Sequence, residues 1–502
     1  MLSSSVVQSS VALTLIPLVV VGCVISYLVG VYRNYRKLSH FKGPPLAAFT
    51  SLWLASQALK ARTYLAQKEA LKQYGSPARI GPRLLVTDDP ELLRHMSAPR
   101  SKWTRSSWYD GMKLDPRVNN IFSERDERRH ADMRSKMIGA YSGKEVDTLE
   151  SDIDENLQRL LDLIRREYNG KPLDMSLLAS FFTLDVLSKI AFGDAFGFLE
   201  ANEDLYNFNK IASQFFKVIE LIVNHETLRR FIQSKPMQKL LAPKGTDEFG
   251  QGRIIGIAQK AVAERYRPDA KVKRDMLGHF IAKGLSQTQA EAESHLQIIA
   301  GSDSTSSALR ITMMMLTGSP VAYRKLVAEI DQAVADGKIS YPIVRYSEAA
   351  ELEYLSACIW EGIRLFPPLF GLQSKLAPPE GETINGVFYP PGTEVAFCCE
   401  GVGRRTDIFG EDADLYRPDR WLHPDPEVRT KYLRTAELMF GSGRFSCLGK
   451  NIALMELHKA FVELLRNFDW ALVDPIKGAS TVAHGIWVQE NMMLVATPRQ
   501  IQ

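Results

Sequence analysis

One stretch near the C-terminal end of the chain carries residue types that can bind a metal-containing cofactor. Residues 440–450 read FGSGRFSCLGK, and an apolar helical pattern begins directly after them, at Asn451. Cys447 therefore lies at a predicted helix N-terminus, where free N–H groups and the helix dipole favour a thiolate over a thiol. The glycines let the backbone approach a large flat group, and Arg444 offers a cationic fork for a carboxylate. A thiolate beside a carboxylate clamp suits a haem with a cysteine axial ligand, whereas a buried structural cysteine is the alternative interpretation.

A second polar group interrupts a long apolar helical pattern. Ser286 and Gln289 have the spacing of a capping box, apolar and small residues continue to Leu316, and Gly-Ser-Pro at 318–320 ends the helix. Residues 300–307 at its centre read AGSDSTSS, where glycine lowers helix stability and hydroxyls compete for backbone carbonyls. Such a conflict inside a buried helix is typical of a functional site, whereas an exposed polar patch is the alternative.

Residues 440–450 resemble the haem-binding loop of the cytochrome P-450 family, Phe-Gly-x-Gly-x-x-x-Cys-x-Gly, at every specified position. The resemblance implies that Cys447 is the proximal ligand of the iron in haem b. It also implies that Arg444 binds a haem propionate and that Phe440 packs beneath the ring.

The centre of the long helix resembles the family's distal motif, Ala-Gly-x-Asp/Glu-Thr-Thr/Ser. The resemblance implies that Gly301 makes room for oxygen and that Asp303 and Ser304 deliver protons to it, with Thr305 following. Ser304 stands where threonine is usual. Serine keeps the hydrogen-bonding group and loses the methyl that fixes the rotamer, so we expect proton delivery with looser coupling.

Three further residues stand where family members bind the haem propionates. His130-x-x-x-Arg134 replaces a Trp-x-x-x-Arg pair, and one helical turn separates the two side chains, so both point the same way. Lys375 replaces an arginine or histidine and would act as a point charge without a bidentate fork. The resemblance also implies a buried charge triad that serves folding and haem retention: Glu361, Arg364 and Arg420.

The order of these motifs implies a fold that is mainly α with small β-sheets. Strands are predicted on both sides of Gly81-Pro82 and of Asn385-Gly386, and from Glu394 to Cys399. Helices are predicted at 152–168, 177–192, 205–222, 352–365 and 451–468. The helix predicted at 205–222 has an aromatic side formed by Phe208, Phe215 and Phe216. This side is interpreted either as part of the core or as the roof of a substrate pocket. Residues 370–373 and 482–487 fall where family members contact substrate.

The N-terminal segment from Val11 to Tyr32 is nearly continuously apolar and long enough to cross a bilayer. A cleaved signal peptide is the alternative, but no basic segment precedes the apolar run. The basic residues Arg33, Arg36 and Lys37 follow at once, so the positive-inside rule predicts a single-pass anchor with the body in the cytosol. We therefore expect an anchor with its basic flank at 1–40 and a haem-thiolate catalytic domain at 41–502. The resemblance implies a proline-rich hinge at 43–45 and a location in the endoplasmic reticulum membrane.

Composition narrows the remaining function classes. A net charge of +4 over 502 residues is too small to indicate nucleic-acid binding. Five cysteines form no disulfide framework, since one lies in the apolar N-terminal segment and two are adjacent in a predicted strand, which fits a reducing compartment.

The resemblance implies a monooxygenase that hydroxylates, epoxidises or otherwise oxidises an apolar small molecule with O2. The amino-acid sequences of the motifs are most similar to those of fungal secondary-metabolism members, so we expect a secondary metabolite as substrate. Electrons would come from an NADPH-cytochrome reductase docked on the cysteine side, at Arg125, Arg128, Arg129, Lys136 and Lys450. Those cations are otherwise a solvated charged face. The alternative functions are a haem-thiolate isomerase or dehydratase without net oxygen insertion, and a non-catalytic haem-binding protein.

Overall fold

The longest helix of the folded body, α14 (Gln287–Thr317), is buried along most of its length. The structure is a computed structural model that describes residues 3–143 and 145–500. Ser286 caps α14, because its Oγ accepts a hydrogen bond from the N–H of Gln289 at 3.3 Å. Only half of the predicted capping box forms, since the Gln289 side chain donates instead to Asn119 O and Glu293 Oε1, at 2.9 and 2.8 Å. The predicted long helix is confirmed, and its first turn is joined to the loop around residue 119.

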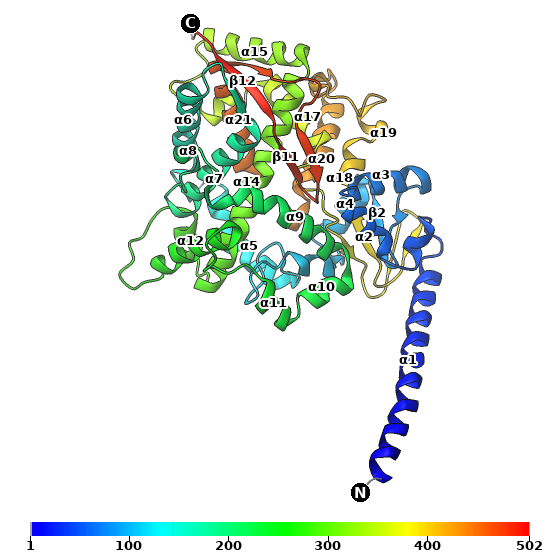
Figure 1. The fold of residues 1–502 in the computed structure, drawn as a ribbon. Coiled ribbons are helices and arrows are strands. Elements are labelled where there is room, and N and C mark those ends of the chain that lie inside the picture. Colours follow the sequence, from blue (N-terminus) through cyan, green and yellow to red (C-terminus); the bar gives the residue numbers. More distant parts are fainter. Residues whose placement is uncertain (1–2, 144, 501–502) are drawn as a thin grey trace.

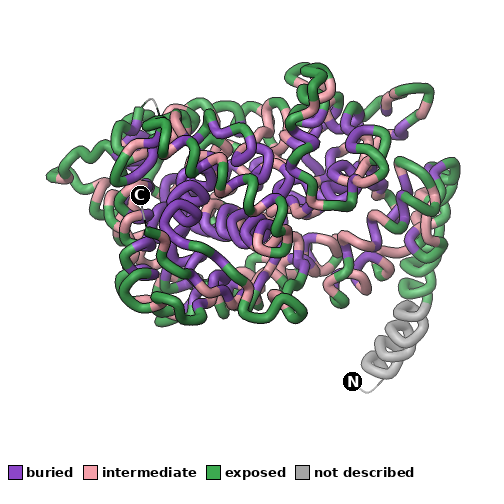
Figure 2. Tube along the Cα trace, turned by 90° about the horizontal axis from the view of Figure 1, so that it is seen from above, coloured by how far each residue is buried: buried purple, intermediate pink, exposed green. Residues whose placement is uncertain are grey.

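Other helices surround α14 and bury it (Figure 1). α7 (Met175–Phe192) packs along it, and Thr183 Oγ1 donates to Ser302 O at 3.1 Å. Figure 2 shows that buried residues concentrate in the middle of the body. The other body helices are α2 (Leu52–Leu59), α3 (Thr63–Tyr74), α4 (Pro90–Ser97), α5 (Glu127–Tyr141), α6 (Leu149–Glu167), α8 (Phe198–Ala201), α9 (Phe208–Asn224), α10 (Glu226–Ile232), α11 (Lys235–Leu241), α12 (Gly250–Arg265), α13 (Met276–Ala282), α15 (Pro320–Ala335), α16 (Tyr346–Ala349), α17 (Glu353–Leu365), α18 (Cys399–Gly403), α19 (Thr406–Phe409), α20 (Pro426–Ala436) and α21 (Lys450–Asn467).

A five-stranded sheet brings together segments that lie far apart in the sequence. Its order is β1 (Ala78–Arg79), β2 (Leu84–Thr87), β8 (Glu394–Phe397), β5 (Lys375–Leu376) and β3 (Thr104–Arg105). β2 and β8 are parallel, and the other pairs are antiparallel. In the register of β3 and β5, Arg105 lies directly opposite Lys375. Directly opposite residues share a face of the sheet, so these two cations lie side by side.

Three smaller sheets complete the predicted α fold with small β-sheets. They are β4 (Pro172–Asp174), β12 (Met493–Pro498) and β9 (Phe468–Leu472); β6 (Glu382–Ile384) and β7 (Val387–Tyr389); and β10 (Ser480–Ala483) and β11 (Trp487–Glu490). The predicted hairpin at Asn385-Gly386 is confirmed. The predicted strand to Cys399 is wrong at its end, because Cys398 Sγ accepts from Gly401 N at 3.3 Å and thereby caps α18.

The long N-terminal helix α1 (Ser3–Lys37) projects away from the body (Figure 1). Its residues Leu18–Lys37 have a mean hydropathy of 1.5 and are not buried, so this helix is long and apolar enough to cross a membrane. α7 meets the same test of length and composition, but 83% of its apolar window is buried, which identifies it as a core helix.

The junction after α1, where the resemblance implies a proline-rich hinge, is packed against the body. The buried Arg79 guanidinium donates to the carbonyl oxygens of Asn34 and Tyr35 at the end of α1, at 3.2 and 3.3 Å. It also donates to Ala48 O at 3.1 Å. At Gly43 a Cβ atom would lie 1.9 Å from Arg79 O, so only glycine allows this approach.

Candidate functional site

The cysteine loop at 440–449 folds back on itself in front of α21. Cys447 N–H donates to Phe440 O at 2.7 Å, and Phe440 lies at the end of the 3-10 turn η5 (Glu437–Phe440). Gly443 has a φ of 57°, and a Cβ there would lie 2.1 Å from Ser97 O in α4. The loop therefore needs glycine both for its backbone conformation and for its contact with α4.

Cys447 is an exposed residue, although protein atoms closely surround its thiol. Burial raises the pKa of this thiol, although the N–H groups of Gly449 and Lys450 and the charge of Arg134 act in the opposite direction. The sequence predicts the favourable helix end correctly. It underestimates desolvation, which opposes the thiolate unless a positive partner such as an iron ion binds it.

Four cations gather around Phe445, two residues before Cys447, and we call them the cation cluster: Arg105, Arg134, Lys375 and Arg444. Lys375 Nζ lies 3.2 Å from the centre of the Phe445 ring, and the guanidinium carbons of Arg105 and Arg444 lie 4.6 and 5.0 Å from it. Arg134 donates to Ser446 O and Ser446 Oγ at 2.8 and 3.0 Å. The structure thus brings three predicted propionate ligands to one place.

The cation cluster is not neutralised by the carboxylates near it. Glu127 lies 3.0 Å from Arg444 Nε, and Glu124 is the second acid that acts on Arg105. Lys375 is 6% exposed, and its Nζ has no hydrogen-bond partner among the described residues. Burial and the neighbouring Arg105 lower the pKa of Lys375 well below its usual value. An unpaired buried ammonium is costly, so the site fits an anionic group such as a haem propionate.

His130 lies within the positive field of the cation cluster. Its ring centre is 5.2 Å from that of Phe445, and its side chain is buried. Burial and the charges of Arg105 and Arg134 lower the pKa of His130 to about 3. The imidazole is therefore neutral at physiological pH and can offer a hydrogen bond to an anion without adding charge.

Arg105 is a member of the cation cluster that sequence reasoning missed. It is 4% exposed, its Nη1 donates to Ile121 O and Glu124 O at 2.8 Å each, and its Nε has no partner among the described residues. No motif marks this arginine. Only the register of β3 against β5, which pairs it with Lys375, brings it to the site.

The polar centre of α14 holds the second group of predicted site residues. Asp303 is buried, and its Oδ2 has no partner among the described residues. Desolvation raises the pKa of Asp303 to about 7, with an opposing effect from Arg310. Ser304 is partly accessible and its Oγ donates to Ala300 O at 2.5 Å, whereas Thr305 is buried. Asp303 therefore exchanges protons near neutral pH, next to an exposed hydroxyl.

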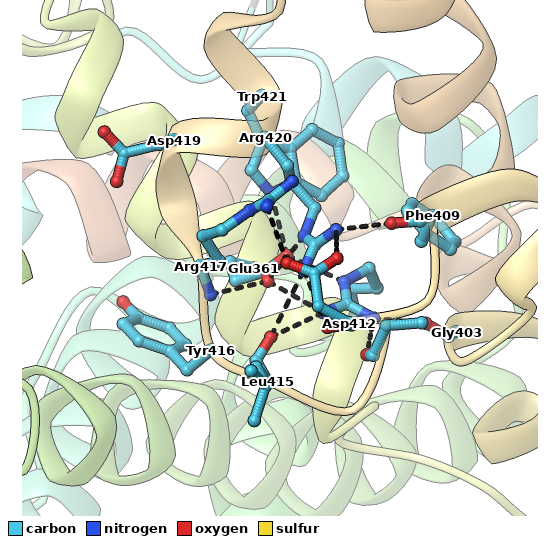
Figure 3. A network of polar contacts seen from close by, with 12 residues as sticks. Glu361, Gly403, Phe409, Asp412, Leu415, Tyr416, Arg417, Asp419, Arg420 and Trp421 are labelled. Carbon is cyan, nitrogen blue, oxygen red and sulfur yellow. Dashed lines mark hydrogen bonds and ion pairs between the residues drawn. The ribbon is translucent and has the colours of Figure 1, made fainter.

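The predicted charge triad, Glu361, Arg364 and Arg420, is confirmed. Figure 3 labels Glu361 and Arg420 within this network. The two oxygens of Glu361 accept from Arg364 Nη2 and Nε at 2.7 Å each, and Oε1 also accepts from Arg420 Nε at 2.9 Å. Trp421 Nε1 donates to Oε2 at 2.9 Å. The three charged side chains are fully buried, with 0% exposure. α17, which carries Glu361 and Arg364, also carries Trp360, whose ring lies 5.9 Å from that of Phe440, so this helix contacts the cysteine loop.

The two open interpretations of the aromatic side of α9 divide by residue. Phe208 is buried, with its ring 6.3 Å from that of Phe198, and belongs to the core. Phe215 lines an outer groove of about 370 Å³ between α9 and residues 240–252.

The comparisons with known proteins agree with this geometry. The model of the family "Cytochrome P450" matches residues 83–486. The chain is 40% identical over 478 residues to Cytochrome P450 monooxygenase ABA1 of Pyricularia oryzae, which covers 93% of each chain. It is 39% identical over 459 residues to aba1 of Botryotinia fuckeliana, covering 90% of each chain. It is 30% identical over 464 residues to cicH of Emericella nidulans, covering 90% of this chain and 92% of that protein.

Proposed function

The chain belongs to the cytochrome P450 family and is a haem-dependent monooxygenase with a cysteine thiolate ligand, and from this premise we propose that Cys447 is that ligand. The observation that carries the proposal is the cation cluster. Its excess of positive charge indicates an anion site around Phe445, two residues before Cys447. Cys398 and Cys399 lie in or beside the short helix α18, where the negative charge of Glu400 adds to burial in raising the pKa of both thiols, so neither has such positive surroundings.

We assign the holding residues by their place around the recess. Lys375, Arg105 and Arg444 would bind the haem propionates, with a hydrogen bond from neutral His130. Arg134 holds the cysteine loop through Ser446, and Phe440 packs between the loop and Trp360. Bound haem supplies the activation of O2, and its thiolate ligand favours cleavage of the O–O bond.

The residues of α14 would move the protons that this reaction consumes. Asp303 Oδ2 has no hydrogen-bond partner in the described part of the chain, and desolvation raises the pKa of Asp303 to about 7, so this oxygen can take a proton and release it at physiological pH. The Ser304 hydroxyl donates to Ala300 O and can turn toward a bound molecule instead. Thr305 is buried, and a secondary role in holding the helix suits it better than direct proton transfer.

We assign residues 1–40 to an anchor with a basic flank and 41–502 to the catalytic domain. The exposed apolar part of α1 supports a single-pass anchor, and we place it in the endoplasmic reticulum membrane with the body in the cytosol. The family uses a redox partner, and we propose an NADPH-cytochrome reductase. The substrate is an apolar small molecule, and the fungal relatives support a secondary metabolite.

Incorporation of labelled oxygen tests this function. We incubate the full-length protein under 18O2 with a fungal NADPH-cytochrome reductase and an extract of cells that contain the substrate. We expect NADPH consumption that depends on the extract and a product that is heavier by one 18O atom. An isomerase or dehydratase would convert its substrate without NADPH and without the label, and a haem-binding protein without turnover would form no product.

A further inference from the structure

A buried arginine lies about two helical turns after Asp303 on α14 and has no ion-pair partner among the described residues. Arg310 is 7% exposed. Its Nε and Nη2 donate to Ser306 O and Ser306 Oγ, at 3.2 and 3.1 Å, and its Nη1 donates to Ser176 O at 3.2 Å. All three acceptors are uncharged oxygen atoms, so none of these hydrogen bonds neutralises the positive charge of Arg310.

The side chain of Arg310 extends back along α14 toward Asp303. Side chains of a helix lean toward its N-terminus, and positions 303, 306 and 310 share one face because they are spaced by three and four residues. The fully buried Ser306 lies between the other two, since its Oγ accepts from Arg310 and donates to Asp303 O at 3.2 Å. A chain of hydrogen bonds thus joins the guanidinium group to the main chain of Asp303.

A purely structural role leaves the charge of Arg310 unexplained. Moving an ion out of water is costly unless a counter-ion compensates, and desolvation lowers the pKa of Arg310 to about 10, so the side chain still carries its charge at neutral pH. A neutral amide could donate to the same kind of oxygen atoms. The contact of α7 with α14 has other support, because Thr183 joins the two helices and both contribute to the largest apolar core.

Asp303 is the unpaired carboxyl group on which the charge of Arg310 acts. Asp303 is buried, and its Oδ2 has no partner in the described part of the chain. Desolvation raises the pKa of Asp303, and the charge of Arg310 lowers it. Asp174 is the other acid that acts on Arg310, but its Oδ1 already accepts from Ser176 N and Ser176 Oγ, at 2.9 and 2.5 Å.

The charged residues on the other elements packed against α14 have partners of their own or lie in solvent. Those with an ion pair or hydrogen bonds are Asp185 and Lys189 on α7, Arg265 on α12, Glu329 on α15, Glu361 on α17 and Glu463 on α21. Asp469 on β9 and Glu490 on β11 are exposed. None of them faces Asp303 as an alternative source of charge.

Several other titratable groups near α14 are uncharged at neutral pH. Burial raises the pKa of Glu293 and of Glu456 to about 8, so both carboxyl groups keep their protons. Burial lowers the pKa of His295 to about 4 and also lowers that of His279, so both imidazoles are neutral. Arg310 is therefore the cation that sets the electrostatic surroundings of Asp303.

We propose that Arg310 is a positioning residue for proton transfer at Asp303: its unpaired positive charge stabilises the carboxylate form of Asp303, so that this residue releases its proton at physiological pH. The inference rests on the proposed role of Asp303 in moving protons. A carboxyl group in a desolvated place without such a charge holds its proton more tightly and donates it less readily near neutral pH. Arg310 acts through Asp303 and needs no contact with the substrate or the haem.

The protonation of Asp303 can be measured without turnover. The full-length haem-loaded protein is titrated from low to high pH, and infrared spectroscopy follows the C=O stretching band of protonated carboxyl groups. Asp303→Asn identifies the band of Asp303 by its loss. We expect a midpoint of about 7 in the wild type. Arg310→Gln keeps hydrogen-bond donors and removes the charge, so it should raise the midpoint by about one pH unit.

Ser306→Ala is the matched control. It removes the hydrogen bond between Arg310 and the Ser306 hydroxyl, whereas the charge remains and the bonds to Ser306 O and Ser176 O still hold the side chain. Its midpoint should equal that of the wild type. As a second readout, the pH at which product formed per NADPH falls should move upward in Arg310→Gln by the same amount as the infrared midpoint.

An unchanged midpoint in Arg310→Gln, or equal shifts in Arg310→Gln and Ser306→Ala, would contradict the inference and leave Arg310 as a structural tie only. Should Arg310→Gln not fold, Arg310→Met removes the same charge with an apolar side chain and gives the same test. Loss of folding in both variants would assign Arg310 to the fold and also contradict the inference. A wild type that forms no product from NADPH and O2 would instead contradict the proposed function, while the infrared midpoints would still decide the role of Arg310.

Discussion

The charge triad and the cation cluster both belong to parts of the structure that contact the cysteine loop, through Trp360 of α17 and through Arg134, and they differ in how their charges are paired. In the charge triad, both oxygens of Glu361 are bound by Arg364 and its neighbours, and the remaining guanidinium N–H groups reach main-chain oxygens such as Ala413 O, at 2.6 Å from Arg364 Nη1. In the cation cluster, Lys375 Nζ and Arg105 Nε have no partner among the described residues. A closed network indicates a structural role, whereas an open one of single sign indicates a binding site for an anion.

Breaking the charge triad should have the largest effect. Glu361→Gln removes the carboxylate that pairs with both fully buried arginines, whereas Asp412 pairs with Arg420 alone. Removal of one partner from a buried pair costs about 3–5 kcal/mol. We expect little or no soluble haem-loaded protein and, for any that remains, a melting temperature many degrees lower. Asp419→Asn is the control, because Asp419 pairs with Lys325 at the surface and its loss costs at most about 1 kcal/mol. Equal yields of the two variants would contradict a structural charge triad.

Removing the unpaired cation Lys375 should have the opposite result: it should weaken haem binding and leave the stability of the fold intact. Lys375→Met deletes a buried charge that no described group neutralises, so the fold should remain intact or become more stable. The same variant should lose haem about tenfold faster, measured as transfer to an excess of apomyoglobin, because one propionate loses a charge-assisted contact. Lys325→Met, at an exposed lysine, serves as control. Unchanged haem retention would show that Lys375 is not part of an anion site.

The pH dependence of the ratio of product formed to NADPH consumed tests the role of Asp303 in α14. Desolvation raises the pKa of Asp303 to about 7, so its carboxyl group is protonated below that pH and charged above it. If the neutral form donates the proton, product formed per NADPH should fall as the pH rises through about 7. Asp303→Asn should give a lower and pH-independent ratio, with more peroxide. The same pH profile in wild type and variant would exclude Asp303 as the proton donor.

The smallest expected effect concerns the outer face of α5. This helix adjoins the cysteine loop through Arg134, and its Arg128 and Arg129 are exposed. Of the other predicted docking cations, Arg125 is paired with Asp110, at 2.8 Å, and Lys136 and Lys450 also have acidic partners. Arg128→Glu with Arg129→Glu should slow haem reduction by the reductase several-fold and flatten its salt dependence. Charge reversal at the exposed Lys477 is the control and should change neither the rate of haem reduction nor its salt dependence. If it changed them as much as the α5 variant does, the docking surface would lie elsewhere.

The sequence predicts the parts of the site whose residues lie close together along the chain. The cysteine loop, the Glu361–Arg364 pair and the polar centre of α14 each occupy a single short segment, so their spacing alone defines them. Arg105 escaped notice because it reaches the cation cluster through a strand register with Lys375, 270 positions away. The hydrogen bond from Arg310 to Ser176 O is likewise set by tertiary contacts, 134 residues apart.

Local patterns also mislead where tertiary contacts offer a better partner. Gln289 does not complete the capping box, because Asn119 O and Glu293 lie within reach of its side chain. Gly43 and the prolines after it predict the end of the helix, but no local pattern predicts that the carbonyl oxygens at the end of α1 accept hydrogen bonds from the buried Arg79. The helix dipole at Cys447 favours the thiolate, and only the folded structure shows how much desolvation opposes it.

The most direct test of the account is the absorption spectrum of the reduced, carbon monoxide-bound protein with and without Cys447. The full-length wild type should show the red-shifted band that a thiolate ligand gives. Cys447→Ala should lose this band completely, while Cys399→Ala, which removes a buried thiol in α18, should keep it. A Cys447→Ala protein that retained the red-shifted band would contradict the assignment of this cysteine, and with it the interpretation of the cation cluster as the place of the haem propionates.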